Sequence, residues 1–389
     1  MKSALSKFLV LAVGLSLTLS GPVSSADSKT SLKTQILIGQ FGSKWSYDFG
    51  DLDSSKGLYY LTDRNSKAID VIDVNKSVVL AKIPGFTGFK GKPEISGPNA
   101  IERDTGSNLA FVSDVNSIKV VDLAKRAIVN SIAIPNTPGN RIDGGCLDPT
   151  DKVALFVAAD DDTPSAFFIS TATQKVIGNV KMPGASGLEG CQYEPTTKSF
   201  YLDVPSNKTN AGGEVDVFSG ADAAAGTPKV AKVYPLSGCE PAGNALGPTI
   251  DGKPQLAIAC DPTDDGKEGD PLFTLVMNVM DGSVVKISQT GAGDQIAYNA
   301  KSNKYYLAAR NWYPSGKVKV GPVASVLGII NAGSASAPPS FDENIPTCLP
   351  TASGGCKSGA HSVATDMVTG RTFVPVGTPG ASVINVYGE

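Results

Sequence analysis

The sequence predicts an all-β protein, a seven-bladed β-propeller with four antiparallel strands in each blade. A turn rich in Asp, Pro, Gly and Asn leads into an aromatic or aliphatic strand, and a polar turn and a second strand follow. The pattern recurs every ~45–65 residues, and a repeat of that length made of short strands is typical of one propeller blade. The copies lie at 55–74, 106–123, 151–170, 197–219, 253–277, 302–330 and 370–388.

Two lone strands predict how the ring closes. The segment KTQILIGQ (33–40) has no strand partner nearby in sequence, and neither does ASVINVYGE at the other end. Pairing the two would remove open strand edges that otherwise invite aggregation. We therefore expect 33–40 to form the outer strand of the blade that ends at Glu389.

Residues 1–26 have the pattern of a secretory signal peptide. Lys2 and Lys7 precede the apolar run FLVLAVGLSLTL, and VSSA ends on small residues, so cleavage is expected after Ala26. The apolar run is short for a membrane span. The predicted domains are the signal peptide at 1–26 and the propeller at 27–389, in a protein of the periplasm or the extracellular space with no membrane span.

The charge balance excludes one class of partner. Without Lys2 and Lys7 the 34 basic residues fall to 32, against 37 acidic ones, which leaves a net charge of −5. No basic stripe is visible, so nucleic acid is not expected as a partner. The predicted partner is a small molecule, with a protein partner on the acidic face as a further option, and the chain is expected to be a monomer.

The cysteines predict three disulfides. An even number of cysteines in an exported protein indicates disulfide bonds. Cys348 and Cys356 flank a Gly-rich loop, and Cys239 and Cys260 would lie at the same end of two neighbouring strands, which leaves Cys146 for Cys191. A metal site is the weaker alternative, because the chain has no CxxC pair and one histidine.

Two of the repeats also resemble a known family. LYYLTDRNSKAIDVIDVNKSVVLAKI (58–83) and LAFVSDVNSIKVVDLAKRAIVNSIAI (109–134) are similar to the YVTN-type repeat of exported seven-bladed propellers. In that repeat an aromatic strand ends in a Thr/Ser-Asn/Asp turn, and a Val-Ile-Asp strand follows. The resemblance implies the fold and leaves the activity open, because propellers host many unrelated activities.

The repeats share one polar position. When they are aligned on the turn before each second strand, the residue five positions earlier falls at the start of the innermost strand. In a propeller these strands line the central channel, so the seven side chains should converge. One exception, Ala242, has Glu240 two residues earlier. We call the set the ring residues: Asp48, Asn99, Asp143, Glu189, Ala242, Asp294 and His361.

The composition of this ring predicts a metal site. Four carboxylates close together repel one another, which would raise the pKa of at least one of them. A divalent cation, Ca²⁺ above all, is the simplest compensation, because it prefers carboxylate and amide oxygens. The alternative is a water-filled channel that is merely lined by polar groups. The expected metal ligands are Asp48, Asn99, Asp143, Glu189 and Asp294.

The composition also resembles the channel sites of calcium-dependent propeller lactonases such as the gluconolactonase family. That resemblance implies an enzyme, a metal-dependent hydrolase in which the ion polarises a carbonyl group or readies a water molecule. Glu189, Asp294 or His361 would act as the base on a small ester or lactone. The alternatives are a non-catalytic propeller that binds a small ligand or a partner protein, and a structural scaffold.

Other residues near the expected channel mouth complete the prediction. Long acidic connections after the second strands, at 160–162 and 261–270, would make this face attract cations. The segment 331–359 is the longest insertion and is expected to act as a lid. Aromatic and arginine side chains would contact an organic ligand, or alternatively pack between blades: Trp45, Tyr47, Arg141, Arg310 and Trp312.

Overall fold

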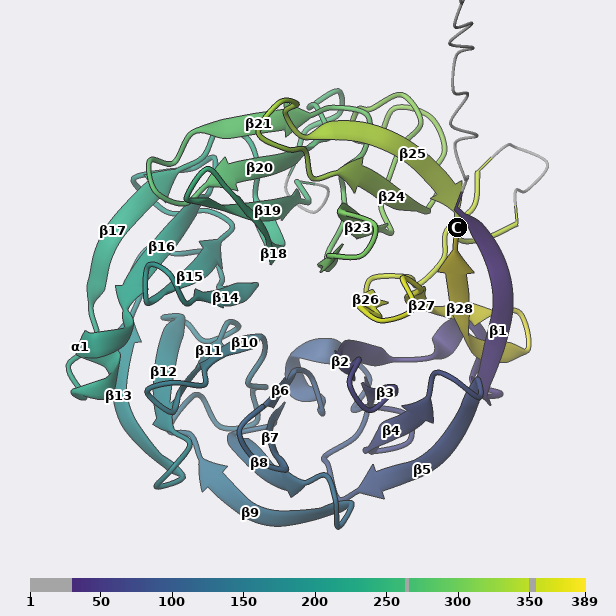
Figure 1. The fold of residues 1–389 in the computed structure, drawn as a ribbon. Coiled ribbons are helices and arrows are strands. Elements are labelled where there is room, and N and C mark those ends of the chain that lie inside the picture. Colours follow the sequence, from purple (N-terminus) through teal and green to yellow (C-terminus); the bar gives the residue numbers. More distant parts are fainter. Residues whose placement is uncertain (1–29, 263–265, 350–354) are drawn as a thin grey trace, which may run out of the picture.

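Seven four-stranded antiparallel sheets stand like blades around a central channel (Figure 1). The structure is a computed structural model that describes residues 30–262, 266–349 and 355–389. The seven-bladed propeller predicted from the repeats is confirmed. The predicted signal peptide at 1–26 lies outside the described residues. Within those residues, no helix has the length and apolar character needed to cross a membrane.

The first three blades follow one another along the chain. Blade 1 consists of β2 (Tyr47–Asp53), β3 (Leu58–Asp63), β4 (Ala68–Asp73) and β5 (Val78–Pro84). Blade 2 consists of β6 (Ile101–Arg103), β7 (Leu109–Asp114), β8 (Ser117–Asp122) and β9 (Ala127–Ala133). Blade 3 consists of β10 (Gly145–Asp148), β11 (Val153–Ala158), β12 (Ser165–Ser170) and β13 (Lys175–Lys181).

The next three blades repeat the arrangement. Blade 4 consists of β14 (Cys191–Glu194), β15 (Ser199–Val204), β16 (Glu214–Ser219) and β17 (Val230–Pro235), with helix α1 (Gly220–Ala224) between its last two strands. Blade 5 consists of β18 (Pro241–Ile250), β19 (Lys253–Cys260), β20 (Thr274–Asn278) and β21 (Val284–Ile287). Blade 6 consists of β22 (Ile296–Asn299), β23 (Lys304–Ala309), β24 (Val326–Asn331) and β25 (Ser340–Pro346).

Blade 7 is built from both ends of the described chain. It consists of β26 (Ala364–Thr365), β27 (Thr372–Thr378), β28 (Ala381–Gly388) and, outermost, β1 (Ser31–Gly39). β1 pairs antiparallel with β28, with Ile36 opposite Ile384. The predicted closure is confirmed, and the strand begins two residues earlier and ends one residue earlier than expected.

The hydrophobic core lies between the blades. Side chains of a strand point alternately to its two faces, and both faces of a middle strand are covered by neighbouring blades. In β3, Tyr59 and Leu61 pack in a cluster with Phe373 of blade 7. Tyr60, between them in sequence, packs with Val112 of blade 2. This explains why the second and third strands read as near-continuous apolar runs.

The acidic residue that precedes the second strand in five of the seven blades has a local structural role. Asp53 ends β2, and its Oδ1 accepts hydrogen bonds from the backbone N–H groups of Ser55 and Lys56 at 3.1 and 3.2 Å. Asp148 does the same for Thr150 and Asp151. Such side-chain bonds stabilise tight turns. The acidic residue that recurs in the sequence repeat therefore marks the turn between the innermost strand and the second strand.

All three predicted cysteine pairs are found at disulfide distance, Cys146–Cys191, Cys239–Cys260 and Cys348–Cys356.

The expected lid over 331–359 is wrong in its first half. Residues Ser340–Pro346 form β25, the outer strand of blade 6, because that blade needs a fourth strand to complete its sheet. The rest of the segment includes 350–354, which lie outside the described residues.

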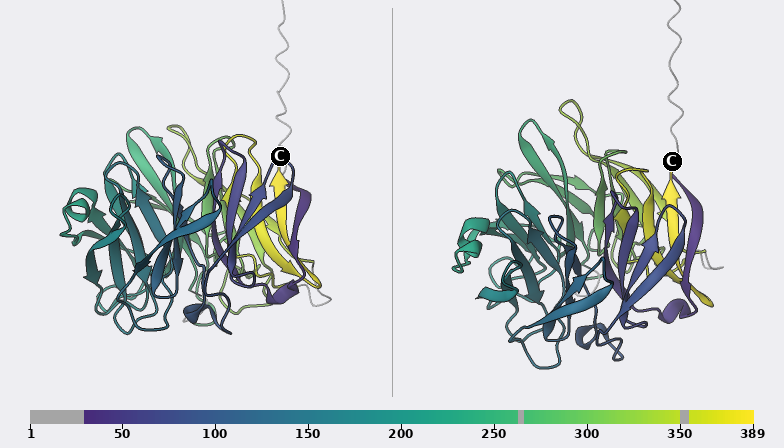
Figure 2. Two further views of the ribbon diagram at one scale, coloured as in Figure 1. Left: turned by 90° about the horizontal axis from the view of Figure 1, so that it is seen from below. Right: turned by 60° about the horizontal axis from the view of Figure 1, so that its bottom comes forward.

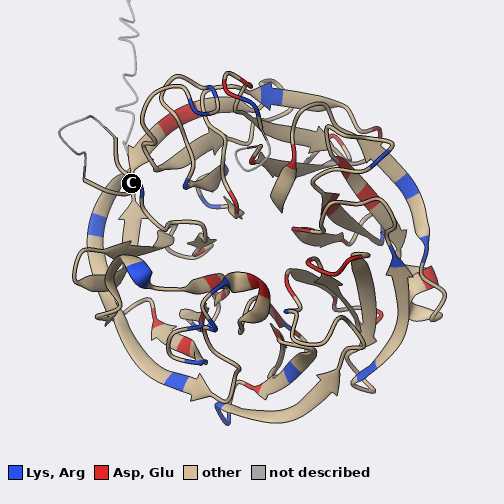
Figure 3. Ribbon diagram, turned by 180° about the vertical axis from the view of Figure 1, so that it is seen from behind, with Lys and Arg blue, Asp and Glu red and all other residues tan. Residues whose placement is uncertain are grey.

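In side view the molecule is a thick disc (Figure 2). The short helix η1 (Gly42–Lys44), which leads into the innermost strand of blade 1, lies on the face opposite the C-terminal end. We call this side, on which the innermost strands begin, the mouth face. Figure 3 shows the disc from the mouth face, with Asp and Glu positions on segments around the central opening.

Candidate functional site

A cavity of about 730 Å³ opens on the mouth face, and we call it the mouth cavity. Six of the seven ring residues line it, as the alignment predicted: Asp48, Asp143, Glu189, Ala242, Asp294 and His361. The seventh, Asn99, is fully buried and does not line the cavity. The common alignment position therefore does bring side chains from different blades to one place.

Backbone hydrogen bonds between neighbouring blades hold several ring residues in register. The N–H of Phe49 donates to the carbonyl oxygen of Asn99 in the next blade at 3.1 Å. The N–H of Gly190 donates to the carbonyl oxygen of Ala242 at 3.0 Å, and that of Gln295 to His361 at 3.1 Å. In each pair the donor follows one ring residue and the acceptor is the next ring residue, so these bonds join three pairs of neighbouring blades at the ring.

Glycines beside the ring let adjacent innermost strands approach closely. A Cβ atom on Gly190 would lie 2.7 Å from the Cα atom of Gly243, and one on Gly243 would collide with the carbonyl oxygen of Asp294. These glycines are required by packing of backbone against backbone. The small neighbours of the ring residues thus narrow the channel below the cavity.

Arg64 is the centre of the charge network on the blade 1 side. It lies in the connection between β3 and β4, is 3% exposed, and forms an ion pair with Asp48. Its Nε and Nη2 donate to Asn99 Oδ1 at 2.9 and 2.7 Å, and its Nη1 donates to the carbonyl oxygen of Tyr47 at 3.1 Å. Asn99 Nδ2 in turn donates to the carbonyl oxygen of Ile142 at 2.8 Å.

Arg141 joins the carboxylates of blade 3. Its Nη2 lies 2.5 Å from Asp143 Oδ2, and its Nε lies 2.8 Å from Asp160 Oδ2. Its Nη1 lies 3.8 Å from Asp48 Oδ2, so this guanidinium also links blades 1 and 3 electrostatically. The surrounding carboxylates outweigh burial and raise the pKa of Arg141, which keeps the side chain charged.

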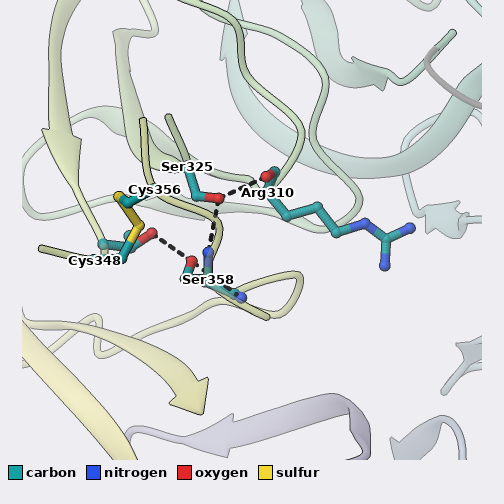
Figure 4. The surroundings of a disulfide bond; sticks show 7 residues. Arg310, Ser325, Cys348, Cys356 and Ser358 are labelled. Carbon is teal, nitrogen blue, oxygen red and sulfur yellow. Dashed lines mark hydrogen bonds between the residues drawn. A yellow bond between two sulfur atoms is a disulfide. The ribbon is translucent and has the colours of Figure 1, made fainter. Parts of the chain in front are cut away.

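Arg310 lies in the cavity wall at blade 6, and hydrogen bonds link it to the segment that follows the Cys348–Cys356 disulfide. Arg310 Nη1 lies 3.0 Å from Asp294 Oδ2. Its carbonyl oxygen accepts from Ser325 Oγ at 2.6 Å, and Ser325 Oγ accepts from the N–H of Ser358 at 3.0 Å (Figure 4). The guanidinium extends away from the disulfide in this view. The disulfide therefore anchors the segment that leads to Gly359 and His361.

His361 is held at the junction of blades 7 and 1. Its ring stacks on Tyr47 with 4.6 Å between centroids and 10° between planes. Its Nδ1 lies 2.8 Å from the carbonyl oxygen of Gly359 and its Nε2 lies 3.1 Å from that of Tyr47. Asp48 Oδ1 is 3.6 Å from Nε2. Both ring nitrogens therefore face backbone oxygens, which suits a packed and positioned ring.

The ring carboxyl groups differ in proton affinity. Burial would raise the pKa of Asp48, but Arg64, His361 and Arg141 lower it from its ordinary value. Burial raises the pKa of Asp143 to about 7 although Arg141 opposes the shift. Burial, together with the charges of Asp143 and Asp294, raises the pKa of Glu189 well above its ordinary value. The sequence predicted that repulsion would raise the pKa of at least one ring carboxyl group, and the pKa values of Asp143 and Glu189 are raised.

The described side chains do not fit the predicted metal centre in this arrangement. Asp48, Asp143 and Asp294 each face a guanidinium group, and Asn99 Oδ1 accepts from Arg64. Across 30–262, 266–349 and 355–389, no three His, Cys, Asp or Glu side chains gather in a way that would hold a metal ion. Arg64, Arg141 and Arg310 supply positive charge beside these carboxylates, which was expected to come from a bound cation. Metal binding stays a prediction.

The residues predicted to contact an organic ligand divide into two groups. Trp45, Tyr47, Arg141 and Arg310 line the mouth cavity. Tyr47 is 1% exposed, and its hydroxyl donates toward the carbonyl oxygens of Gly359 and Pro375, so it also ties blade 1 to blade 7. Trp312 is not part of the lining and packs in the core between blades 5 and 6.

The acidic connections contribute in part. Asp160, Asp161 and Asp261 line the mouth cavity, and so does Glu240, the acid noted beside Ala242. Residues 264 and 265 lie outside the described residues, and Asp162, Glu268 and Asp270 are not in the lining. The predicted electronegative face therefore has its structural counterpart in the cavity wall.

Sequence reasoning missed Arg64, although a signal for it was present. The connections between second and third strands were expected on the mouth face, and Arg64 directly follows the second strand of blade 1. An arginine at this position is the signal for an internal counter-ion to the ring carboxylates. A second cavity of about 300 Å³ lies further along the channel, with Glu102 and Gln192 among its lining residues.

Comparison with known proteins supports the fold. No family model matches the chain, and no curated protein matches it. Among solved structures, the chain is similar to hydrazine synthase of Kuenenia stuttgartiensis, with a TM-score of 0.61 and 13% identity over 94% of this chain and 99% of that one. At this identity the similarity concerns the fold alone. The YVTN-type and gluconolactonase-like resemblances stay predictions.

Proposed function

We propose that the mouth cavity binds a small polar molecule and hydrolyses it, with an ester or lactone as the substrate class. The observation that carries this proposal is that Asp143 and Glu189, from adjacent blades, open into one cavity of about 730 Å³ beside Arg141. Concave sites with a few convergent polar groups are the usual places for small ligands in proteins.

The two carboxyl groups suit acid–base chemistry. With its pKa raised well above the ordinary value, Glu189 remains a protonated acid at a pH where most carboxyls have ionised, and it would donate to the leaving oxygen. Asp143, whose pKa is about 7, would accept a proton from the attacking water near neutral pH. N–H groups of Arg141 or Arg310 would stabilise negative charge that develops on the carbonyl oxygen.

The predicted cation has no step in this scheme, because guanidinium groups face most of the ring carboxylates. Elemental analysis of mature protein purified without chelators tests the metal prediction directly. About one equivalent of calcium per chain, lost in Asp143→Ala, would support a metal-centred hydrolase instead.

The predicted export to the periplasm or the medium is part of the proposal, and the three cysteine pairs agree with an oxidising compartment.

A non-catalytic binding role is the second candidate. The position of His361 favours it, because both ring nitrogens lie against backbone oxygens and neither is placed to serve as the predicted base. In that case the cavity would hold a ligand or a partner segment without changing it.

Hydrolysis assays separate the two candidates. We expect a panel of small lactones and esters to include a substrate whose turnover falls by at least ~100-fold in Glu189→Gln and Asp143→Asn. Glu268→Gln is the matched control, since that side chain is exposed and outside the cavity lining. Ligand binding without turnover of any compound would favour the binding role, and turnover that survives both substitutions would contradict the proposed site.

A further inference from the structure

We infer that the ligand of the mouth cavity carries an organic cation, an ammonium or guanidinium group. This inference rests on the part of the proposed function that makes the cavity a ligand site, and it names the chemical class of the ligand. It combines the charge balance of the wall, the partners of the wall's own cations, and the size and aromatic content of the cavity.

The wall has more negative than positive groups. Its lining includes nine Asp and Glu side chains and four Lys and Arg side chains. The excess of five carboxyl groups lies in a concave, partly desolvated space, where field lines concentrate. With Glu189 protonated, as in the scheme proposed above, eight acidic side chains still face four basic ones. A neutral ligand would leave this excess unbalanced, and an anionic one would add to it.

Three of the four cations of the wall are already engaged by protein carboxylates, and the fourth is the exposed Lys44, which forms no ion pair among the described residues. Arg64 pairs with Asp48 in the cavity wall, and Arg141 lies 2.5 Å from Asp143 and 2.8 Å from Asp160. An anionic ligand would have to compete with these carboxylates for a guanidinium group. Among the described residues of the wall, Lys44 is thus the one cation that a carboxylate or phosphate ligand would meet without a competing carboxylate, against nine acidic side chains.

Glu189 is the ring carboxyl group without such a contact. Among the described residues, no Lys, Arg or His nitrogen forms an ion pair with it, although it lines the cavity. An ammonium group placed there would favour the ionised form of Glu189, which is protonated in the empty site proposed above, and would lie in the field of Asp143 and Asp294, both of which act on Glu189. Charge-assisted hydrogen bonds of this kind are among the stronger polar contacts in proteins.

The shape of the site favours an organic cation over a bare metal ion. A volume of about 730 Å³ accommodates a molecule with many atoms. Phe89, which is 39% exposed, and Phe49 both line the cavity, and the face of an aromatic ring attracts ammonium and guanidinium groups. The carboxylates themselves are spread around the wall, with no three gathered for a metal within the described ranges.

Calorimetric titration of the mature chain with matched probes tests the inference. The probes are putrescine and agmatine as cations, butanediol as the uncharged equivalent, succinate as the anion, and calcium chloride. We expect a cationic probe to bind in preference to the diol and succinate, and to bind at least ~10-fold more weakly to Glu189→Gln. Glu240→Gln, a second lining variant, should weaken the same probe if Glu189→Gln fails to fold, and Glu268→Gln should not.

The possible outcomes separate this inference from the proposed function. Binding of the diol or succinate as tight as that of the amines, binding of calcium alone, or no binding at all would overturn the cationic ligand. Turnover of a neutral or anionic ester that depends on Glu189 would keep the hydrolase and overturn this inference. Amine binding that depends on Glu189, without hydrolysis of any compound, would keep the inference and remove the hydrolase.

Discussion

Arg64 lies in the connection between the second and third strands of blade 1, and its guanidinium forms a buried ion pair with Asp48 on the innermost strand. The side chains are 4% and 7% exposed. The same guanidinium bonds Asn99 of blade 2, so one side chain joins three segments. A buried charge whose partner is removed is strongly unfavourable.

Arg64→Met should therefore lower the free energy of unfolding by about 3–5 kcal/mol, since it leaves the buried Asp48 without its nearest cation and Asn99 Oδ1 without its donor. Asp48→Asn should cost a comparable amount, and the double variant should cost less than the sum. Urea unfolding of the four proteins gives this double-mutant cycle. Additive losses would show that the two side chains are not coupled.

Because the innermost strands approach closely, replacing glycine by alanine should change protein stability very differently at Gly243 and at Gly187. Gly243→Ala places a Cβ atom against the carbonyl oxygen of Asp294 and should destabilise the protein by about 1–3 kcal/mol. Gly187 also lines the mouth cavity, but a Cβ atom there would meet nothing within 4 Å. Gly187→Ala should be nearly neutral by thermal unfolding. Equal losses in the two variants would contradict the packing role of Gly243.

Ring closure predicts a contrast between neighbouring residues of β1. Ile36 is 1% exposed and packs in the core, whereas Leu37 is 62% exposed. Ile36→Ala should cost about 2–4 kcal/mol through lost burial and the cavity left behind. Leu37→Ala should change stability little. If chemical unfolding showed the two variants to be alike, β1 would not be the closing strand of blade 7 in solution.

The Cys348–Cys356 disulfide should matter for both stability and the cavity wall. Replacing both cysteines by serine removes a short cross-link and should lower the free energy of unfolding by about 2–3 kcal/mol in the chain-entropy treatment. Because Ser358 and Gly359 follow the disulfide and contact Ser325 and His361, ligand binding should weaken as well. Calorimetry at a temperature where the variant is folded separates the two effects, and unchanged affinity would show that the wall holds without the disulfide.

Asp216 predicts a pH dependence of stability. It is 2% exposed, and its Oδ1 has no hydrogen-bond partner among the described residues. Burial and the neighbouring Glu214 raise its pKa to about 7. A carboxyl group that holds its proton more tightly when folded favours the folded state at low pH. That contribution is lost as the pH rises from the unfolded pKa, near 4, to about 7.

Asp216→Asn should therefore raise the free energy of unfolding at pH ~8 by roughly 2–4 kcal/mol, because one pKa unit corresponds to about 1.4 kcal/mol. At pH ~4 the gain should vanish. Asp281→Asn serves as the control, because its carboxyl group is exposed, its pKa is lowered, and it should show no gain at alkaline pH. A stabilisation by Asp216→Asn that is the same at both pH values would refute the assignment.

Much of the fold could be predicted because its signals are local. The turn-forming acids Asp53 and Asp148 precede the second strands of their blades and mark where each innermost strand ends. The alternation of Ile36 and Leu37 marks an edge strand with one covered face. The lid expected at 331–359 failed because the strand content of blade 6 was not counted, and Ser340–Pro346 completes that sheet.

The sequence predicted where the candidate site lies, but it did not predict which side chains line it. Equivalent positions in the repeats led to Asp143, Glu189 and Asp294, since propeller geometry brings equivalent residues to one axis. The place of Trp312 in the core, away from the cavity, was not readable, because an aromatic residue near a strand end has the same pattern in either position.

The sequence by itself determined the number of blades, the closing strand, the cysteine pairs and the ring positions, because each follows from a periodic or neighbouring pattern. Only the tertiary structure decided which charges meet. Arg64, Arg141 and Arg310 lie on separate segments, and their pairing with Asp48, Asp143 and Asp294 depends on distances of a few ångströms. Coulomb energies change steeply over such distances. For that reason the same list of residues suggested a calcium site in the sequence and a network of ion pairs in the fold.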